Sequence, residues 1–525
     1  MANSALLPGQ SGLPVPNPTA SYWHKEPSQT LLGHRTTEQL PKSADVVIVG
    51  SGITGTMAAE FLREKMPAKS VVMLEAREAC WGATGRNGGH CQPNMYAGQP
   101  HIASFELRNY SCLKTLVENF NIPCDWHTTT GVHAFYNKEL FSIAKGLVED
   151  LTDKYPDLAA NVALVTKGEG GSPAWLLKEE RKELTLEGLR VGGAEGAVVQ
   201  WHAASLWPYK LVTFVLERLL AASVREGKGL FNLQTGTAVT GISQTTNPTS
   251  QRSKPDEVDA QPGRMWTVHT PRGDIAASQI LLATNGYTSH LLPSFSDLLV
   301  PVQGQISALK PPQEPKSPSD PPLDIGHTFV IEGEPDAPFD RDDYLIQRPP
   351  PTAELIYGGG RGHAKGRAVG VWDDSEIDDP VAWYLRGELS GLVDLSLRHG
   401  DAAEQDYSGK IPKQDLNPTH EWTGIMGYSR DGHPFVGAVP QTLGGGDGLW
   451  VCAGYTGHGM PNAALCAKAV VDMMVAEGRD GEGDVEIDLP PEYEITPERL
   501  AAARLKETVR EVDERGSLFA DFGAG

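Results

Sequence analysis

Three glycines and one glutamate have the spacing of a dinucleotide-binding site. Gly50, Gly52 and Gly55 form the pattern G-x-G-x-x-G, and Glu75 follows at the end of the next apolar run. The first glycine permits a tight turn, the second lets a pyrophosphate approach the backbone, and the third lets helix and strand pack closely. A carboxylate at this distance can accept hydrogen bonds from ribose hydroxyls. The neighbouring residues predicted to contact the same ligand are Ser51, Ile53, Thr54, Ala76 and Arg77.

Two strands and a helix must position these residues. Val46 to Val49 is an apolar, β-branched run, as expected of a parallel strand buried on both faces. Thr54 to Met66 is a predicted helix whose N-terminus points at the phosphates. Val71 to Leu74 is a second apolar strand that ends on Glu75. This order favours dinucleotide binding over a simple glycine-rich turn, but it does not choose between NAD and FAD.

Composition excludes several classes of protein. The chain has 525 residues, too many for one core, and a net charge of −22, which argues against nucleic acid and anionic membranes as partners. None of the six cysteines forms a C-x-x-C pair, so we expect no metal site and free thiols in a reduced, cytoplasmic protein. No signal peptide or membrane-spanning segment is expected.

Further elements are predicted along the chain. Residues 1–42 are rich in Pro, Ser and Thr and are interpreted as an extended arm anchored by Tyr22 and Trp23, with a disordered tail as the alternative. The predicted helices are Ala103 to Phe120, Leu140 to Lys154, the segment opened by Trp207-Pro208 (with Val224 on its apolar face), Trp383 to Leu397 and Asn462 to Met474. The predicted strands are Gly236 to Ile242, Met265 to His269, Gln279 to Ala283 and Gly448 to Gly454, and Leu355 to Gly362 is predicted as a strand that runs into a glycine-rich turn. Asn247 to Gly263 and Lys310 to Pro322 are interpreted as loops.

Three later segments set polar residues among glycines. They are G-A-T-G-R-N-G-G-H (Gly82 to His90), A-T-N-G-Y (Ala283 to Tyr287) and G-Y-T-G-H-G-M-P-N (Gly454 to Asn462). With the opening motif and with Trp422 to Gly437, they resemble the FAD-dependent oxidoreductases of the D-amino-acid oxidase superfamily. Within it the chain is most similar to the branch of sarcosine oxidase and γ-glutamylputrescine oxidase. The cofactor contacts that the resemblance implies are Ala83, Thr84, Arg86, Asn87, Gly88, Gly89, Thr284, Asn285, Gly286, Gly454, Tyr455, Gly457, His458, Gly459 and Met460.

The resemblance implies an α/β fold with a discontinuous, Rossmann-like FAD-binding domain and a second domain built on a mixed β-sheet that carries the substrate site. The expected division assigns 43–106, 201–292 and 420–480 to the FAD-binding domain, 107–200 and 293–419 to the substrate domain, 1–42 to the arm and 481–525 to a peripheral tail.

The implied chemistry is hydride transfer from a carbon next to an amine nitrogen to flavin N5, followed by hydrolysis of the imine and reoxidation by oxygen or another acceptor. The expected substrate is a small amine: a secondary amine, a polyamine or an amino acid. The alternatives are a biosynthetic tailoring enzyme for a larger substrate and a flavin-binding protein without turnover. The candidate catalytic residues are His90, Arg361 and His458, with His363 as a further cation. For each of these the alternative is a side chain that only caps a turn.

The resemblance also bears on how the flavin is held. Sarcosine oxidase-like enzymes attach it through a cysteine, and no cysteine lies between Glu421 and Pro440. We therefore expect FAD to bind without a covalent bond, with His90 as the main alternative attachment point.

Overall fold

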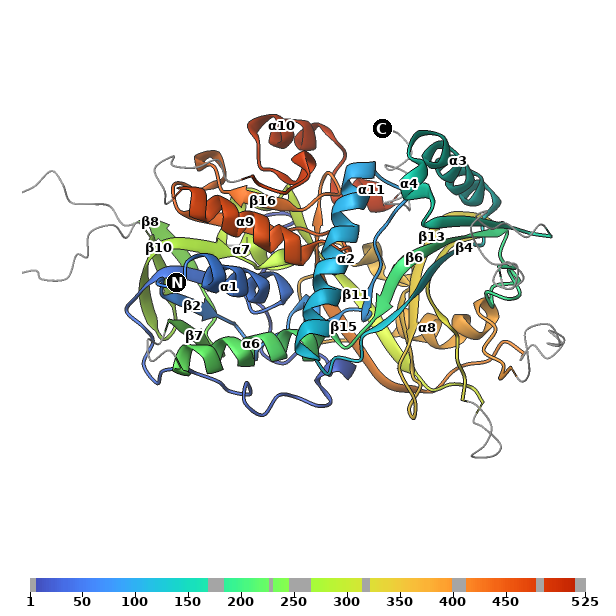
Figure 1. Cartoon of the computed structure of the whole chain (residues 1–525), viewed down its shortest axis with the longest axis horizontal. Helices are drawn as coiled ribbons and strands as arrows, with labels where there is room; N and C mark the ends of the chain where they lie inside the picture. The colour runs from blue at the N-terminus through green and yellow to red at the C-terminus, as the bar shows by residue number, and fades with distance from the viewer. Residues whose placement is uncertain are drawn as a thin grey trace, which may run out of the picture.

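The computed structural model describes residues 6–168, 184–225, 230–244, 266–313, 322–398, 412–477 and 486–514. Within these residues the chain forms one sheet of eight strands and one of nine (Figure 1). The long helix α2 (Pro100–Phe120) runs between the two halves of the molecule, each of which has its own helices. The predicted combination of a Rossmann-like sheet and a mixed sheet is confirmed.

The first sheet carries the glycine motif. Its strands are β1 (Ser43–Val49), β2 (Val71–Leu74), β7 (Phe231–Gln234), β8 (Gly241–Gln244), β9 (Trp266–Thr270), β10 (Gly273–Leu282), β16 (Phe435–Ala438) and β17 (Leu449–Ala453). The order is β16-β17-β10-β1-β2-β7. In addition, β9 pairs with the first half of β10, and β8 pairs with β9. Strands β17, β10, β1, β2 and β7 are parallel, so their carboxyl ends meet at one edge.

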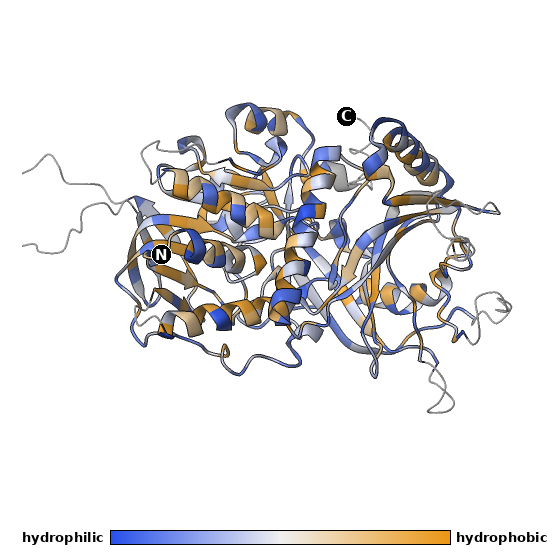
Figure 2. Cartoon of the chain, in the orientation of Figure 1, coloured by the Kyte–Doolittle hydropathy of each residue, from blue (hydrophilic) through white to orange (hydrophobic). Residues whose placement is uncertain are grey.

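Helices cover both faces of this sheet. On one face α1 (Ile53–Lys65) packs between α6 (Pro208–Arg225) and α9 (Ala463–Glu477). The other face is covered by segments that include α7 (Thr288–Leu291) and α10 (Pro497–Leu505), and α11 (Val509–Glu514) follows. Figure 2 shows the strands of this sheet and α9 as predominantly hydrophobic, whereas α2 and α3 (Lys138–Lys154) carry both hydrophobic and hydrophilic residues. The sheet is therefore buried on both sides, as a parallel sheet requires.

The second sheet is mixed and forms the other half. Its strands are β3 (His90–Cys91), β4 (His127–Phe135), β5 (Val162–Thr166), β6 (Gly196–Ser205), β11 (Leu299–Leu309), β12 (His327–Glu334), β13 (Ala337–Gln347), β14 (Leu355–Gly359) and β15 (Pro418–Ser429). The order is β15-β11-β14-β13-β12-β4-β6-β3, with β5 beside β6. Among the described strands of this sheet, only the β12–β4 pair is parallel. Helix α8 (Asp379–Leu392) packs on β11 and β14, and α3 and α4 (Pro156–Ala159) lie at the far end (Figure 1).

Short 3₁₀ turns complete the chain. They are η1 (Tyr22–His24), η2 (Ala83–Arg86), η3 (Asn285–Tyr287), η4 (Pro293–Phe295), η5 (Arg361–His363), η6 (Lys365–Ala368), η8 (Gln441–Leu443) and η9 (Pro491–Tyr493). None of the helices in the described part of the chain is long and apolar enough to cross a membrane.

Several sequence predictions need correction. Gly236 to Ile242 is not one strand, because the chain turns between β7 and β8. Helix α8 begins earlier than Trp383, because the Asp378 side chain accepts a hydrogen bond from Val381 N and caps it, and it ends at Leu392. Val224, predicted on the apolar face of α6, is 79% exposed. The predicted loop at 247–263 and the centre of the one at 310–322 lie outside the described residues.

The sheets also bear on the expected domain division. Strand β3 lies within 43–106 and β15 starts next to residue 420, yet both strands pair in the second sheet. Residues of both strands are expected in the FAD-binding domain, but they belong to the second sheet. The boundaries of the domains stay a prediction.

Candidate active site

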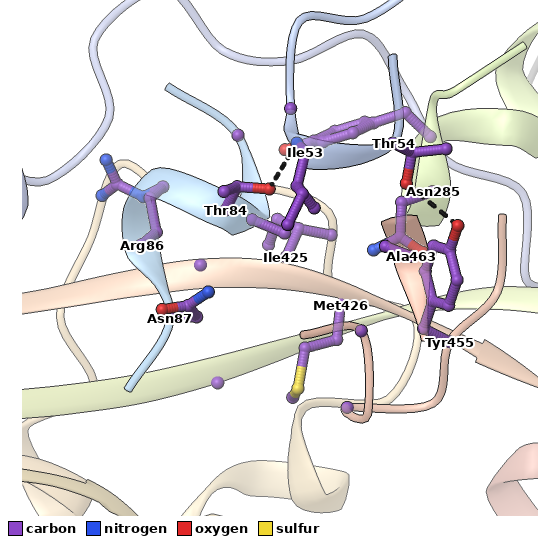
Figure 3. Close-up of a pocket in the computed structure, with 18 of the residues that line it drawn as sticks. Ile53, Thr54, Thr84, Arg86, Asn87, Asn285, Ile425, Met426, Tyr455 and Ala463 are labelled. Carbon is purple, nitrogen blue, oxygen red and sulfur yellow. Dashed lines mark hydrogen bonds between the residues drawn. The ribbon is translucent and has the colours of Figure 1, made fainter. Parts of the chain in front are cut away.

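A cavity of about 410 Å³ lies where the carboxyl edge of the first sheet meets one face of the second. Its lining comes from the glycine turn after β1, the loop at η2, the segment after β10, strands β11 to β15 and the turn before α9 (Figure 3). Ligands of open parallel sheets bind outside the carboxyl ends of the strands, which is where this cavity sits. The location makes the cavity the candidate active site.

Glycine is required at two positions of the turn after β1. Gly50 has φ of +107°, a region that side chains disfavour. A Cβ on Gly55 would lie 2.0 Å from the carbonyl oxygen of Gly50, so α1 could not pack this closely against β1 with any larger residue. Gly52 is the N-cap of α1 and offers no side chain to the helix end. The turn therefore brings the positive end of α1 to the cavity wall.

Glu75 is fixed by the same turn. Its Oε2 accepts hydrogen bonds from the backbone N–H of Ser51 (3.1 Å) and the hydroxyl of Ser51 (2.6 Å), and its Oε1 accepts one from Arg77 N (2.9 Å). The residue is 8% exposed and lines the cavity. Since each carboxylate oxygen has two lone pairs, Glu75 can still accept from a ligand hydroxyl.

The loop at η2 crosses the start of α1. Thr84 Oγ1 accepts a hydrogen bond from Ile53 N (3.0 Å; Figure 3), which satisfies the first free amide of the helix. Arg86 is only 1% exposed. Its guanidinium donates to Thr423 O and to Thr19 O, each at 2.6 Å, and lies 3.3 Å from an Asp374 carboxylate oxygen. Its Nη1 has no hydrogen-bond partner among the described residues. Arg86 thus holds three chain segments together at the edge of the cavity.

The N-terminal arm takes part in this site. Tyr22 and Trp23 are 1% and 0% exposed, as predicted for its anchors. Leu13 and Pro14 line the cavity, and Arg77 pairs with Asp374 at 2.9 Å where the arm passes. Sequence reasoning missed these contacts, because neither an apolar dipeptide in a Pro-rich arm nor an isolated aspartate carries a signal.

The turn before α9 forms another wall. The Tyr455 hydroxyl lies 2.9 Å from Thr54 Oγ1 of α1 (Figure 3) and 3.1 Å from the Cys452 sulfur. Gly457 has φ of +81°, and Thr456 adopts the same left-handed region. The turn is therefore tied to the glycine motif from the far end of the chain.

His458 in this turn is paired with a buried carboxylate. Its Nε2 lies 3.1 Å from Glu106 Oε2 of α2. Burial alone would lower the pKa of His458, but the negative charge of Glu106 raises it above its ordinary value. Glu106 is 3% exposed and also accepts from Asn94 N and Asn462 Nδ2. Sequence analysis missed Glu106, although an acidic residue on the buried face of a predicted helix is a usable signal.

His90 has the opposite character. Burial, and secondarily the charge of His458, lowers its pKa to about 4, so the ring is neutral near pH 7. Its Nδ1 has no hydrogen-bond partner among the described residues, and its ring meets Tyr344 edge to face at 5.4 Å. Both residues line the cavity. A neutral imidazole there can donate or accept a hydrogen bond.

Arg361 contributes a cation from the second sheet. Two glycines with positive φ, Gly359 and Gly360, turn the chain at the end of β14 and place Arg361 in the cavity wall. Its Nη2 lies 3.2 Å from Asp342 Oδ2, and the guanidinium lies 5.1 Å from the centre of the Tyr428 ring. His363, by contrast, is exposed and stacks on Tyr384 outside the lining.

The structure brings most of the predicted site residues to one cavity. All of the proposed catalytic and cofactor-binding residues line it except Gly55, Gly89, Gly286 and Gly454. These four pack behind the lining: a Cβ on Gly89 would meet the Trp23 ring at 2.5 Å, and one on Gly286 would meet Met426 O at 2.5 Å. The lining residues absent from the predictions include Gln92, Tyr287, His290, Gln305, Asp342 and Tyr428. The roles of the predicted residues remain proposals.

Several solved structures have the same fold. Glycine oxidase from Geobacillus kaustophilus has a TM-score of 0.59 and 17% identity, over 87% of this chain and 99% of that one. L-Amino acid deaminase from Proteus myxofaciens, in complex with anthranilate, has a TM-score of 0.59 and 14% identity, over 93% and 99%. L-Proline dehydrogenase from P. horikoshii has a TM-score of 0.57 and 17% identity, over 88% and 99%. At these identities the likeness shows the fold alone.

The family comparison is decisive for the cofactor class. No curated protein sequence matches the chain at a significant level. The model of the DAO family, described as FAD dependent oxidoreductase, matches residues 45–473. That match extends from β1 through most of α9 and includes every glycine-rich segment of the cavity. The chain therefore belongs to the FAD dependent oxidoreductase family.

Proposed function

We propose that this protein binds FAD non-covalently in the cavity and oxidises a carbon–nitrogen bond of a small amine or amino acid. The observation that supports this most is that one cavity is lined by two different groups of residues. One group comprises the glycine turn, a helix N-terminus and Glu75, which suit a dinucleotide. The other comprises a neutral histidine and an arginine, His90 and Arg361, which suit a reacting amine and an anionic group.

The residues present fit FAD. Gly50 to Gly52 and Glu75 would hold the pyrophosphate and ribose, and Arg86 lines the same cavity. The loop at η2, the segment from Thr284 and the turn at Tyr455 to Met460 would hold the ring system. When bound, FAD supplies the electron-accepting ring that takes a hydride from the substrate, and oxygen or another acceptor restores it.

The chain's own residues would do the remaining work. A substrate amine must be neutral to release hydride, and the His90 ring, itself neutral near pH 7, can accept a hydrogen bond from it. Arg361 can bind a substrate carboxylate. His458, whose pKa the Glu106 carboxylate raises above its ordinary value, can supply a positive charge to the cavity wall. Glycine oxidase, proline dehydrogenase and the iminodiacetate oxidase of Chelativorans act, by their names, on amino or imino acids, which supports this substrate class.

The first test is spectral. The purified protein should be yellow, and an amine or amino acid from a panel should bleach the flavin under anaerobic conditions, with peroxide formed in air if oxygen is the acceptor. Bleaching only by a non-amine would favour the tailoring enzyme. Binding without bleaching by any compound would leave a flavin-binding protein without turnover. A colourless protein that cannot be reconstituted with FAD and binds NAD would contradict the proposal itself.

Acid precipitation should release intact FAD into the supernatant. No cysteine is among the described residues that line the cavity. Burial raises the pKa of the Cys452 thiol to about 12, so it does not provide a thiolate for attachment. A pellet that stays yellow through denaturation and washing would show a covalent bond and point first to His90.

Changing His90 to Gln or Arg361 to Ala should slow flavin reduction or reoxidation at least ~10-fold, the lower end of a general acid–base effect, while FAD stays bound. Stopped-flow measurement of both half-reactions gives the result. His363→Gln is the matched control, because His363 is exposed and outside the cavity lining, and it should leave both rates unchanged. Wild-type rates in the His90 and Arg361 variants would remove these residues from the site.

A further inference from the structure

The cavity-facing side of the second sheet carries two carboxyl groups in direct register. Glu332 of β12 lies opposite Asp342 of β13 in an antiparallel pair. Directly opposite residues project to the same face, with Cβ atoms roughly 4.5–5.5 Å apart. The next pair on the same face of these strands, Val330 and Tyr344, lines the cavity, and so does Asp342. The two carboxyl groups therefore adjoin each other at the cavity wall.

Both groups have an oxygen that lacks a partner. Glu332 is 2% exposed, and its Oε1 has no hydrogen-bond partner among the described residues. The same is true of Asp342 Oδ1, whereas Asp342 Oδ2 pairs with Arg361. A buried carboxylate without a partner is costly, and two adjacent carboxyl groups do not both ionise easily. One proton between the two unpartnered oxygens would satisfy both.

We propose that Glu332 and Asp342 hold one proton between them at neutral pH, with Glu332 as the protonated member and Asp342 as the carboxylate that faces Arg361. Arg361, Asp342 and Glu332 then carry no net charge together. Glu332 serves as a positioning residue, because its O–H fixes the Asp342 carboxylate that in turn holds Arg361.

The surroundings of Glu332 agree with this assignment. Burial, and secondarily the charge of Asp342, raises the pKa of Glu332 to about 8. Burial, and secondarily the charge of Glu332, raises the pKa of Tyr96, whose hydroxyl lies 2.9 Å from His133 Nδ1 of β4. Burial lowers the pKa of His133 to about 3. No described cation other than Arg361 is paired with Asp342, and none is paired with Glu332.

The consequence for the cavity is a dependence on pH. As the pH rises past about 8, Glu332 loses its proton and the three-residue group becomes negative. An anionic substrate group held by Arg361 should then bind more weakly. This effect on the cavity rests on the proposed function; the shared proton does not.

The shared proton can be tested without turnover. In the folded protein Glu332 stays protonated to about pH 8, whereas in the unfolded chain it ionises near its ordinary pKa. Between these two pKa values the free energy of unfolding of the wild type should therefore fall, with rising pH, relative to that of Glu332→Gln. Above pH 8 the free energies of unfolding of the two proteins should change with pH in parallel. Denaturant midpoints from pH 4.5 to 9 give this difference. Glu149→Gln, which changes a carboxylate with 63% of its side chain exposed, should show no such pH-dependent difference.

Asp342→Asn tests the pairing itself. The Asp342 charge helps to hold the proton on Glu332. Removing it should lower the pH up to which the stability of the protein falls relative to its Glu332→Gln counterpart. An infrared titration of wild-type protein with ¹³C-labelled glutamate should show one protonated glutamate carboxyl at pH 7 that is lost toward pH 9. This measurement stands even if the variants fold poorly. No such carboxyl, or an upper pH limit unchanged by Asp342→Asn, would overturn the proposal.

The effect on the cavity has a separate readout. For a carboxylate-bearing substrate identified by flavin bleaching, KM should rise several-fold between pH 7.5 and 9 in the wild type with kcat little changed, and this rise should be absent in Glu332→Gln. An equal rise in both proteins would show that the pair does not act on Arg361. If no substrate reduces the flavin, the proposed function fails while the stability and infrared results still decide the shared proton.

Discussion

Gly55→Ala is expected to abolish tight FAD binding and to destabilise the protein by about 1–3 kcal/mol, the range for overpacking. The added Cβ would lie 2.0 Å from Gly50 O and 3.2 Å from the Ile48 side chain. Neither neighbour can yield cheaply, because one is backbone and the other is a buried residue of β1. The clash is relieved only if α1 moves away from β1, which displaces the turn at Gly50 to Gly52 and the helix end that faces the cavity.

The measurement is the molar ratio of flavin to protein after gel filtration, together with a denaturant unfolding curve of the apoprotein. Gly146→Ala is the matched control: Gly146 lies in the middle of α3, and an added Cβ there has nothing within 4 Å. It should keep its flavin and gain up to about 1 kcal/mol from the better helix propensity of alanine. A Gly55→Ala protein with a full complement of flavin and wild-type stability would show that close packing of α1 on β1 is not what shapes the site.

The glycine turn is the part of the site that the sequence predicts best, and the reason is its locality. Gly50, Gly55 and Glu75 belong to a single strand–turn–helix–strand unit, and the conformations that require glycine are set by neighbours within that unit. Most strands of the parallel sheet can be predicted from such local patterns. The mixed sheet is expected from the family resemblance, since few of its described strands, β14 among them, are predicted from their own sequence.

Other features depend on contacts across the chain, and local patterns do not contain them. Glu106 matters because α2 packs against α9, which brings it to His458 at a separation of 352 residues. Tyr344 lines the cavity because the register of β13 with β12 and β14 turns it inward, whereas the strand's own sequence mixes charged and apolar residues on both faces. The error at Gly236 to Ile242 has the same origin, since β8 is defined by its pairing with β9.

The N-terminal arm shows this limit most clearly. It precedes the family match, which begins at residue 45, yet Leu13 and Pro14 line the cavity. Ser11 N donates to Ser289 Oγ at 2.9 Å, and Thr19 Oγ1 accepts from Thr423 N at 2.9 Å. The Ser21 hydroxyl donates to Gly85 O in the loop at η2 (2.8 Å). The arm is therefore joined to both halves of the molecule and to the loop predicted to contact the flavin.

Deletion of residues 1–16 should weaken FAD binding by ~10-fold or more without unfolding the protein. The truncation removes Leu13 and Pro14, and losing the burial of one leucine against a ligand is worth about 1.5–3 kcal/mol, where 1.4 kcal/mol corresponds to tenfold. It leaves Thr19 and Ser21 in place, with Tyr22 and Trp23 still buried against Trp207 and Trp422, so the anchor of the arm should hold. Quenching of flavin fluorescence on titration into the apoprotein gives the dissociation constant, and circular dichroism checks the fold.

Two companions make this result specific to the cavity. Deletion of residues 1–8 removes only residues that precede the cavity-lining pair, among them Leu6 and Leu7 with exposures of 44% and 51%, and it should leave the dissociation constant of FAD unchanged. Leu13→Ser keeps the arm's backbone and replaces one lining side chain, so it should reproduce part of the loss. If the 1–16 truncation and Leu13→Ser both bind FAD as tightly as the full chain, the arm covers the cavity without contributing to cofactor affinity. Retention of the flavin must then come from the glycine turn and the three later glycine-rich segments alone.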